Sequence, residues 1–215
     1  MATAYLGQSF TNEQIEKFFV ENNYEVPEKY AEENLFKFVS QKIADGNVIA
    51  WFQGRAEFGP RALGNRSFLA DPRNKDIQSL MNEKIKKREL FRPFAPSVKE
   101  ECAEDFFEIK QKSPFMNIVS KVREDKKSVI PAVTHIDGTA RVHTVSEAGN
   151  YRYWHLIDEF EKITGVGLLL NTSFNIQEPI INTPAQAVTA FVNSGIDYLV
   201  LNDFVMDVAW KEAQK

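Results

Sequence analysis

The segment from Gly54 to Ser67 combines residue types that bind anions. It reads GRAEFGPRALGNRS, and Arg55, Arg61 and Arg66 each offer a planar fork of N–H donors that suits phosphate or carboxylate. Its spacing matches neither a P-loop nor a dinucleotide fingerprint, so nucleotide binding would need another geometry. The alternative is a tight structural loop in which these arginines pair with Glu57 and other carboxylates.

A second cationic segment, residues 86–97, reads KKRELFRPFAPS. Lys86 and Arg92 can reach one anion if the chain bends between them, which the following proline favours because it disfavours helix at the residue before it. The alternative is the usual enrichment of basic residues at a helix C-terminus, where the helix dipole favours cations. That alternative explains Lys86 and Arg88 better than Arg92, which has apolar neighbours.

Small polar residues follow an apolar run near residue 170. The letters LLL precede NTSFN, which places Asn171 and Ser173 at the carboxyl end of a buried strand, where open α/β sheets bind ligands. Their alternative role is to cap the strand in a turn. Arg141 interrupts the apolar alternation of ARVHTVS just after the Asp-Gly-Thr at 137–139. It either pairs with a buried acid or faces a pocket.

Histidine and cysteine chemistry is not expected. His135, His143 and His155 lack the spacing of a metal-binding motif, so we predict no metal site and place these side chains on helix or strand surfaces. Cys102 lies among glutamates that would raise its pKa and disfavour a thiolate nucleophile.

The amino-acid composition excludes several classes of protein. The 215 residues are 43% hydrophobic, which is enough to close a core. The net charge of −4 disfavours a nucleic-acid binder, although residues 53–92 carry ten basic against five acidic side chains and so suggest a focused anion site. A single cysteine fits a reducing cytoplasm. No apolar run approaches ~18 residues and no export signal is evident, so we expect a soluble cytoplasmic chain without a membrane partner.

Apolar periodicity predicts alternating helices and strands. A capping box at Thr11 starts the first helix, and a second capping box at Thr183 starts a late one. The expected helices cover 12–22, 28–45, 74–87, 99–107 and 151–163 and begin again at 184; the expected strands cover 47–52, 67–70, 94–98, 116–122, 140–146, 166–170 and 198–206. Without repeats or a linker, residues 1–215 are predicted to form one α/β domain with a mixed sheet.

Together these segments resemble a known family. GRAEFGPRALGNRS, KxRELFRPFAPSV, DGTARVHTV and LLNTSFN occur in this order, and the chain closely resembles the C-terminal domain of NodU/CmcH-type O-carbamoyltransferases from AYLGQSF at 4–10 to the last strand. The resemblance implies a YrdC-like domain, with a twisted, open α/β sheet flanked by helices and a positively charged concave face.

The resemblance also implies an activity. In this family the domain binds ATP and carbamoyl phosphate and forms a carbamoyl-adenylate, and Mg²⁺ accompanies the nucleotide. A separate Kae1-like N-terminal half, with no counterpart in this chain, then transfers the carbamoyl group to a hydroxyl. We therefore expect the adenylate-forming half-reaction only. The acceptor cannot be read from these residues.

Individual residues carry over by motif. The resemblance assigns phosphate, carbamoyl and nucleotide contacts to the motif residues, with Lys86, Arg92 and Arg61 as the catalytic set and Arg61, Arg141, Asn171 and Ser173 as the binding set. The two neutral side chains would act as hydrogen-bond donors. An alternative reading is a YrdC-like module that binds nucleotide or tRNA without turnover, and the acidic composition disfavours its RNA form.

Overall fold

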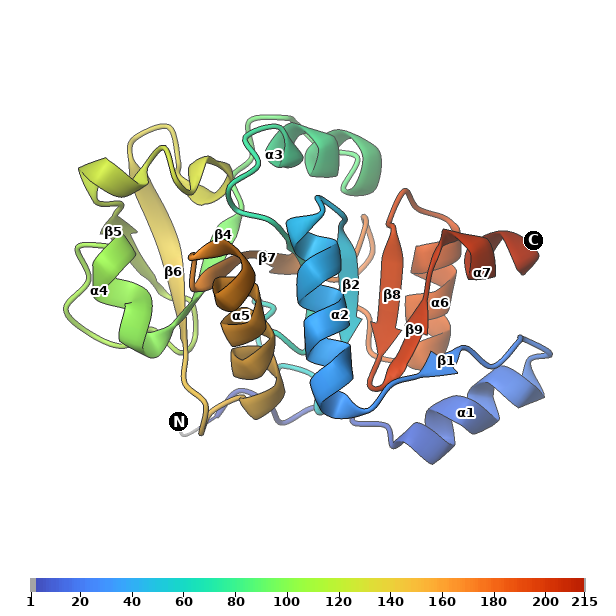
Figure 1. Ribbon diagram of the computed structural model, residues 1–215. Helices are drawn as coiled ribbons and strands as arrows, with labels where there is room; N and C mark the ends of the chain where they lie inside the picture. The colour runs from blue at the N-terminus through green and yellow to red at the C-terminus, as the bar shows by residue number, and fades with distance from the viewer. Residues whose placement is uncertain (1–2, 215) are drawn as a thin grey trace.

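The fold is built on one mixed sheet. The computed structural model describes residues 3–214, and within them nine strands follow the order β1-β9-β8-β2-β3-β7-β4-β6-β5 (Figure 1). Most neighbours are antiparallel, whereas β2 with β8 and β4 with β6 are parallel. The strands are β1 Glu28–Lys29, β2 Ile49–Phe52, β3 Arg66–Ala70, β4 Ala95–Lys99, β5 Ile118–Lys121, β6 Thr139–Val145, β7 Leu168–Ser173, β8 Tyr198–Leu201 and β9 Phe204–Met206.

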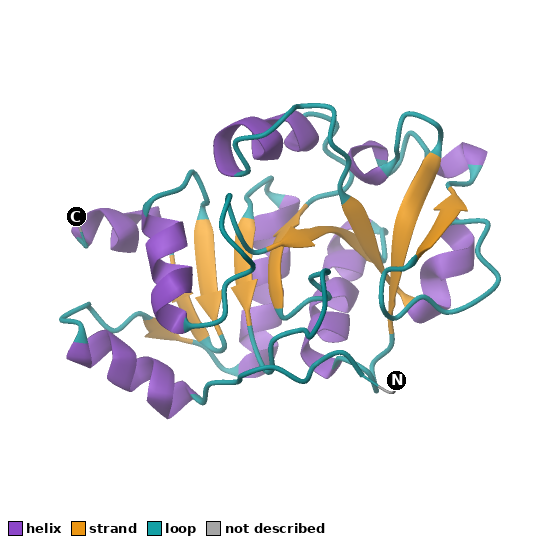
Figure 2. Cartoon of the chain, turned by 180° about the vertical axis from the view of Figure 1, so that it is seen from behind, coloured by secondary structure: helices purple, strands orange, loops and turns teal. Residues whose placement is uncertain are grey.

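Helices cover both faces of this sheet. Figures 1 and 2 show α2 and α5 side by side on one face and α6 on the other. The longer helices are α1 Asn12–Glu21, α2 Glu32–Ala44, α5 Tyr151–Thr164, α6 Pro184–Val192 and α7 Val208–Ala213; the short ones are α3 Ile77–Leu80 and α4 Ala103–Phe106, with a π-helical turn at Met81–Ile85 and 3₁₀ turns at Glu100–Cys102, Glu124–Lys126 and Pro131–Val133.

Local sequence accounts for where the main helices begin. The side-chain oxygens of Thr11 and Thr183 each accept a hydrogen bond from the backbone N–H three residues later. The glutamine at that later position accepts, through its side-chain oxygen, from the backbone N–H of the threonine. Both predicted capping boxes therefore form. Asn150 caps α5 in a similar way, and Gly165 ends that helix at φ 74°, a left-handed conformation that glycine adopts without strain.

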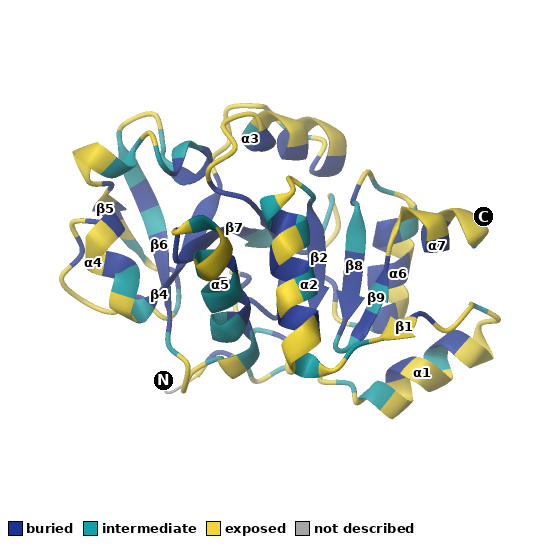
Figure 3. Ribbon diagram, viewed as in Figure 1, coloured by how far each residue is buried: buried dark blue, intermediate teal, exposed yellow. Residues whose placement is uncertain are grey.

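The core lies between the sheet and these helices. The central strands β2 and β3 are buried along their whole length, and α2 and α5 each have a buried stripe of residues that faces the core (Figure 3). Trp51, Phe68 and Phe160 are among its largest fully buried side chains. The predicted α/β class with a single mixed sheet is confirmed.

Several predicted boundaries are wrong. Strand β7 continues through Asn171 to Ser173, because these residues pair with β3, so the small polar residues belong to the strand. The expected strand 198–206 is a hairpin, in which Asn202 takes a positive φ of 50° between β8 and β9. The expected helix 74–87 is a short α-helix followed by a π turn, and the helix 99–107 is likewise divided into two short turns.

Candidate functional site

One carboxylate organises the loop between β2 and β3. Oε1 of Glu57 accepts from the backbone N–H groups of Leu63 at 2.6 Å and Asn65 at 2.8 Å, so the loop closes around it. Gly64 must be a glycine because its φ is 95° and a Cβ there would lie 2.1 Å from the ring of Tyr153. The loop is thereby held close to α5.

Arg66 at the end of this loop is structural. Its side chain is fully buried and lies 3.5 Å from the centre of the Phe52 ring. The guanidinium donates to the main-chain oxygens of Gln53 at 2.6 Å, Gln8 at 3.1 Å and Gly54 at 3.2 Å, so it fastens the N-terminal segment to the loop. Burial lowers the pKa of Arg66 to about 10.

A pocket of about 260 Å³ gathers most of the predicted residues. It brings Arg61 from the loop, Arg92 from the segment before β4 and Arg141 from β6 to the end of β7, where Asn171 and Ser173 lie. Five of the six residues expected from the sequence therefore share one pocket. Its lining consists of Pro60, Arg61, Ala62, Arg88, Arg92, Pro93, Phe94, Ala95, Met116, His135, Arg141, Asn171, Thr172 and Ser173.

The pocket is cationic and contains no acid among its lining residues. Burial lowers the pKa of the half-buried Arg141, and the charge of Arg61 lowers it further. Within residues 3–214, the ion-pair partner of Arg92 is the distant Glu89 at 3.8 Å, and over half of the Arg92 side chain is exposed. Unpaired cations that repel one another inside a concave site favour an anionic ligand.

Lys86 lies beside this pocket without lining it. Its Nζ donates to the main-chain oxygens of Ser173 and Asn175, both at 2.8 Å, and to Oδ1 of Asn175 at 2.9 Å. Burial, followed by the charge of Arg88, lowers the pKa of Lys86 to about 7. Its contacts hold the end of β7 in place, so its geometry is that of a positioning residue.

Two pocket residues were assigned elsewhere by sequence reasoning. Arg88 was attributed to the helix end and His135 to the surface, but both line the pocket. Arg88 is held by Oδ1 of Asn82 at 2.7 Å and lies over Phe94, 4.9 Å from its ring centre. The signal for Arg88 was its place two residues after Lys86 in the KxR segment; the sequence carried no comparable signal for His135.

The expected surface position of His143 is wrong. Its side chain is 2% exposed, and its Nδ1 lies 2.8 Å from Oγ of Ser97. Pairing of β6 with β4 places the two residues opposite each other inside the sheet. No group of three metal-ligating His, Cys, Asp or Glu side chains forms within residues 3–214. Cys102 has a raised pKa, first because of burial and then because of Glu161.

The fold and the site define an α/β domain with a cationic pocket, and comparison with known proteins gives its family. Residues 40–207 match the family described as the carbamoyltransferase C-terminus, and the chain belongs to that family. It is 55% identical over 76% of its length to nodulation protein NolNO of Sinorhizobium fredii. It is 42% identical over 77% to the 3'-hydroxymethylcephem-O-carbamoyltransferase of Amycolatopsis lactamdurans. The matches span only 25% and 31% of those two relatives.

Solved structures support the YrdC-like fold. HypF in its phosphate- and nucleotide-bound form superposes with a TM-score of 0.55 at 16% identity, over 79% of this chain and 25% of HypF. YciO of E. coli gives a TM-score of 0.55 at 11% identity, over 86% of this chain and 92% of YciO. The predicted family and fold are both confirmed. No helix within residues 3–214 is long and apolar enough to cross a membrane.

Proposed function

We propose that the pocket binds ATP and carbamoyl phosphate and forms carbamoyl-adenylate. The observation that carries the proposal is the convergence of four arginines, from three separate segments, on one pocket whose lining contains no carboxylate. Two polyanions must approach each other in this reaction, so fixed cations are needed to offset their repulsion. The nucleotide and phosphate in the HypF structure support this assignment.

The proposed reaction forms carbamoyl-adenylate in two steps. Water releases inorganic phosphate from carbamoyl phosphate and leaves carbamate. A carbamate oxygen then attacks the α-phosphorus of ATP, and pyrophosphate leaves with the electron pair of the broken P–O bond. Arg61, Arg92 and Arg141 would stabilise the charge that develops on the phosphoryl oxygens. Lys86 would act through the end of β7, which it holds.

Magnesium would travel with the nucleotide. The pocket lining offers no carboxylate ligand, and Mg²⁺ commonly binds through substrate phosphates and water. The residues present fit an ion held by ATP, and this ion would neutralise phosphate charge. Transfer to an acceptor hydroxyl would require the additional portion that the longer relatives contain, in a Kae1-like half.

Two measurements test this proposal. Calorimetry should detect saturable Mg-ATP binding, and a coupled assay should detect pyrophosphate release that depends on carbamoyl phosphate. This chain alone should not carbamoylate an alcohol. Folded protein that gives no binding at millimolar nucleotide, or that prefers tRNA with a steep salt dependence, would contradict the proposal.

A further inference from the structure

The N-terminal segment lies across the loop between β2 and β3. Residues 4–8, which we call the N-terminal strap, run antiparallel to residues 56–58 of this loop. The main-chain hydrogen bonds between the two segments are 2.7–2.9 Å long. A Cβ at Gly7 would lie 2.9 Å from the side chain and the carbonyl of Ala56, so the strap comes this close only because residue 7 is a glycine. The strap therefore fixes the beginning of the loop.

Tyr5 extends this contact to the other end of the loop. Its hydroxyl donates to the main-chain oxygen of Leu63 at 2.8 Å and accepts from Nδ2 of Asn150 at 3.0 Å. Both directions are determined, because a carbonyl can only accept and Oδ1 of Asn150 already accepts from the backbone N–H of Tyr153. Burial raises the pKa of Tyr5 above its usual range, so the hydroxyl keeps its proton. The strap, the loop and the first turn of α5 thus meet at one hydroxyl.

Leu63 is held through its backbone and its side chain, two residues after Arg61. Its N–H donates to Glu57 at 2.6 Å, and its carbonyl accepts from Tyr5. Residues 58–61 between these anchors are exposed, so the direction of Arg61 depends on where Leu63 is held. The Leu63 side chain belongs to a small apolar cluster outside the main core, together with Ala4, Ala95 and Met116.

The hydroxyl of Tyr5 can be removed without removing the strap. The main-chain bonds between the strap and residues 56–58 do not involve this hydroxyl. The guanidinium of Arg66 also continues to hold the carbonyl of Gln8 at 3.1 Å. A phenylalanine at position 5 therefore leaves the strap in place and releases the carbonyl of Leu63.

We propose that Tyr5 is a positioning residue for the cationic pocket, whose hydroxyl holds the loop so that Arg61 is directed towards the ligand before the ligand binds. The inference rests on the proposed function for its ligand. Without the hydroxyl, the carbonyl of Leu63 and the amide of Asn150 both lose a partner, and the loop visits positions in which Arg61 is turned away. Only the ordered fraction of the chains is then ready to bind, and the apparent affinity falls by that fraction.

Two measurements on Tyr5→Phe and the wild-type chain test the proposal. Hydrogen exchange, followed by mass spectrometry, should be at least about fivefold faster in the peptide that contains Leu63 and Asn65, whose N–H groups donate to Glu57. Calorimetry should show Mg-ATP binding weakened at least about fivefold, because a buried carbonyl has lost its donor. Saturating Mg-ATP should return the exchange of this peptide to the wild-type rate, since the ligand binds the ordered loop.

A matched control separates this role from the general loss of a hydroxyl. Tyr30→Phe removes a tyrosine hydroxyl that donates to Glu28 at 3.0 Å, in the segment between β1 and α2. It should change neither the exchange of the loop nor the affinity for Mg-ATP.

A second variant tests the contact from the other side. Asn150→Ser keeps an oxygen that can cap α5 but lacks the Nδ2 donor to Tyr5. It should also weaken Mg-ATP binding. Combining it with Tyr5→Phe should lose less than the product of the two single losses, because both changes break the same contact.

Each outcome decides a separate claim. If the folded wild-type chain binds no Mg-ATP, the proposed function fails and the positioning role fails with it. If wild type and Tyr5→Phe bind Mg-ATP equally tightly, the inference is overturned while the proposed function stands. Equal exchange of the loop in these two chains also overturns it, as does an equal loss of affinity in Tyr30→Phe.

Discussion

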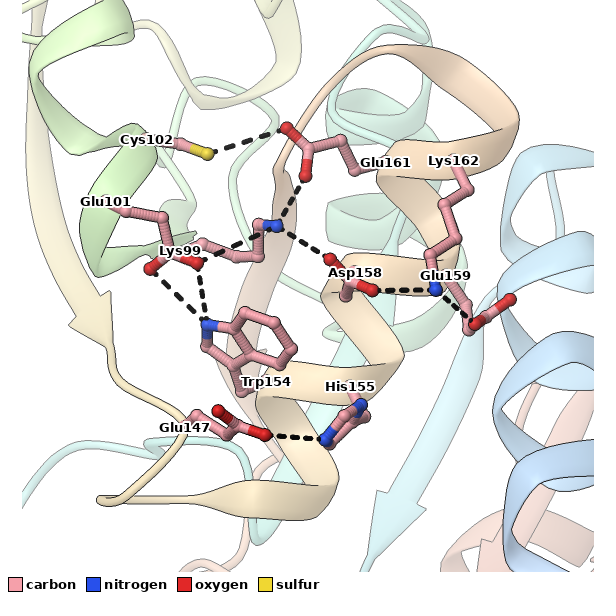
Figure 4. A network of polar contacts seen from close by, with 10 residues as sticks. All are labelled: Lys99, Glu101, Cys102, Glu147, Trp154, His155, Asp158, Glu159, Glu161 and Lys162. Carbon is pink, nitrogen blue, oxygen red and sulfur yellow. Dashed lines mark hydrogen bonds and ion pairs between the residues drawn. The ribbon is translucent and has the colours of Figure 1, made fainter.

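The cations of the pocket and the cation at Lys99 have opposite surroundings. Nζ of Lys99 lies 2.6 Å from Glu161, 2.7 Å from Asp158 and 3.7 Å from Glu101 (Figure 4). Its side chain is only 8% exposed and also lies near the ring of Trp154. Three carboxylates therefore surround this one positive charge.

In the pocket the charges remain available. Arg61, Arg88 and Arg141 form no ion pair with any carboxylate among residues 3–214, and Arg88 and Arg141 have lowered pKa values because burial and a neighbouring arginine both disfavour the charged form. Removing one partner of an ion pair within the fold destabilises the protein, whereas unpaired cations cost stability and leave their charges free for a ligand. The difference separates cations that are paired within the fold from cations that are not.

The largest expected effect is on ligand binding. Replacing both Arg61 and Arg141 with alanine should weaken Mg-ATP binding at least about a hundredfold, because each hydrogen bond to a charged group contributes about 1.5–3 kcal/mol. The melting temperature should stay the same or rise, since like-charge repulsion is relieved. Calorimetry and thermal unfolding measure the two effects, and exposed Lys87→Ala is the control. Unchanged affinity with a lower melting temperature would make these arginines structural.

The second prediction concerns Lys99, where a substitution should lower stability without changing ligand affinity. Lys99→Met leaves Asp158 and Glu161 without their shared cation and should cost about 2 kcal/mol, which lowers the melting temperature by about 4–8 °C. The affinity for Mg-ATP should not change. Lys110→Met is a matched control, because its pair with Glu104 has side chains 84% and 67% exposed and should contribute little. A loss of affinity in Lys99→Met would remove the distinction between the two regions.

The third prediction concerns acid. Burial would raise the pKa of Asp158, but hydrogen bonds from Lys162 and Lys99 outweigh it and lower the value. A carboxylate with a lowered folded-state pKa stabilises the protein above its unfolded pKa of about 3.9 and loses that contribution as the pH falls below it. The stability difference between wild type and Lys99→Met, measured by urea unfolding, should therefore narrow from pH 6 to pH 3. A difference that stays constant would show that the contact is not ionic.

The smallest expected effect is at Ser173. Its hydroxyl donates to Oδ1 of Asn175 at 2.6 Å, so it is engaged within the protein. Ser173→Ala removes only a neutral contact and should weaken Mg-ATP binding about threefold. Titration of this variant beside Arg61→Ala measures the ratio. An equal loss in both variants would show that charge does not dominate the site.

The sequence identified the family and most of the expected residues that line the pocket. The capping boxes at Thr11 and Thr183 are local patterns, and both formed as predicted. Because arginine has a fixed charge and planar N–H donors, these residues indicated an anion site before their positions in the fold were known. The order of long motifs was specific enough to indicate the carbamoyltransferase C-terminal domain, and the comparisons confirmed it.

Only the tertiary structure decided which cations line the pocket and which are buried within the fold. Arg61 and Arg66 belong to one loop and have the same chemistry, yet Arg61 lines the pocket while Arg66 is buried among main-chain oxygens. Oxygens of Gln8 and Gln53 meet there because the N-terminal segment crosses the loop, and no local pattern shows that crossing. Lys86 likewise reaches β7 across 87 residues of sequence.

Asn171 shows the same limit most clearly. Its residue type and its place after an apolar run were visible in the sequence, but the hydrogen bonds that its amide makes were not. Both of its N–H bonds are taken by Ala62 and Ser97, which lie 109 and 74 residues away. The order of the strands brings these side chains together. Both N–H bonds of the Asn171 amide are then used, and its Oδ1 has no donor among residues 3–214. The sequence determines which hydrogen bonds each side chain can make. The pairing of distant strands decides which of these bonds form within the protein.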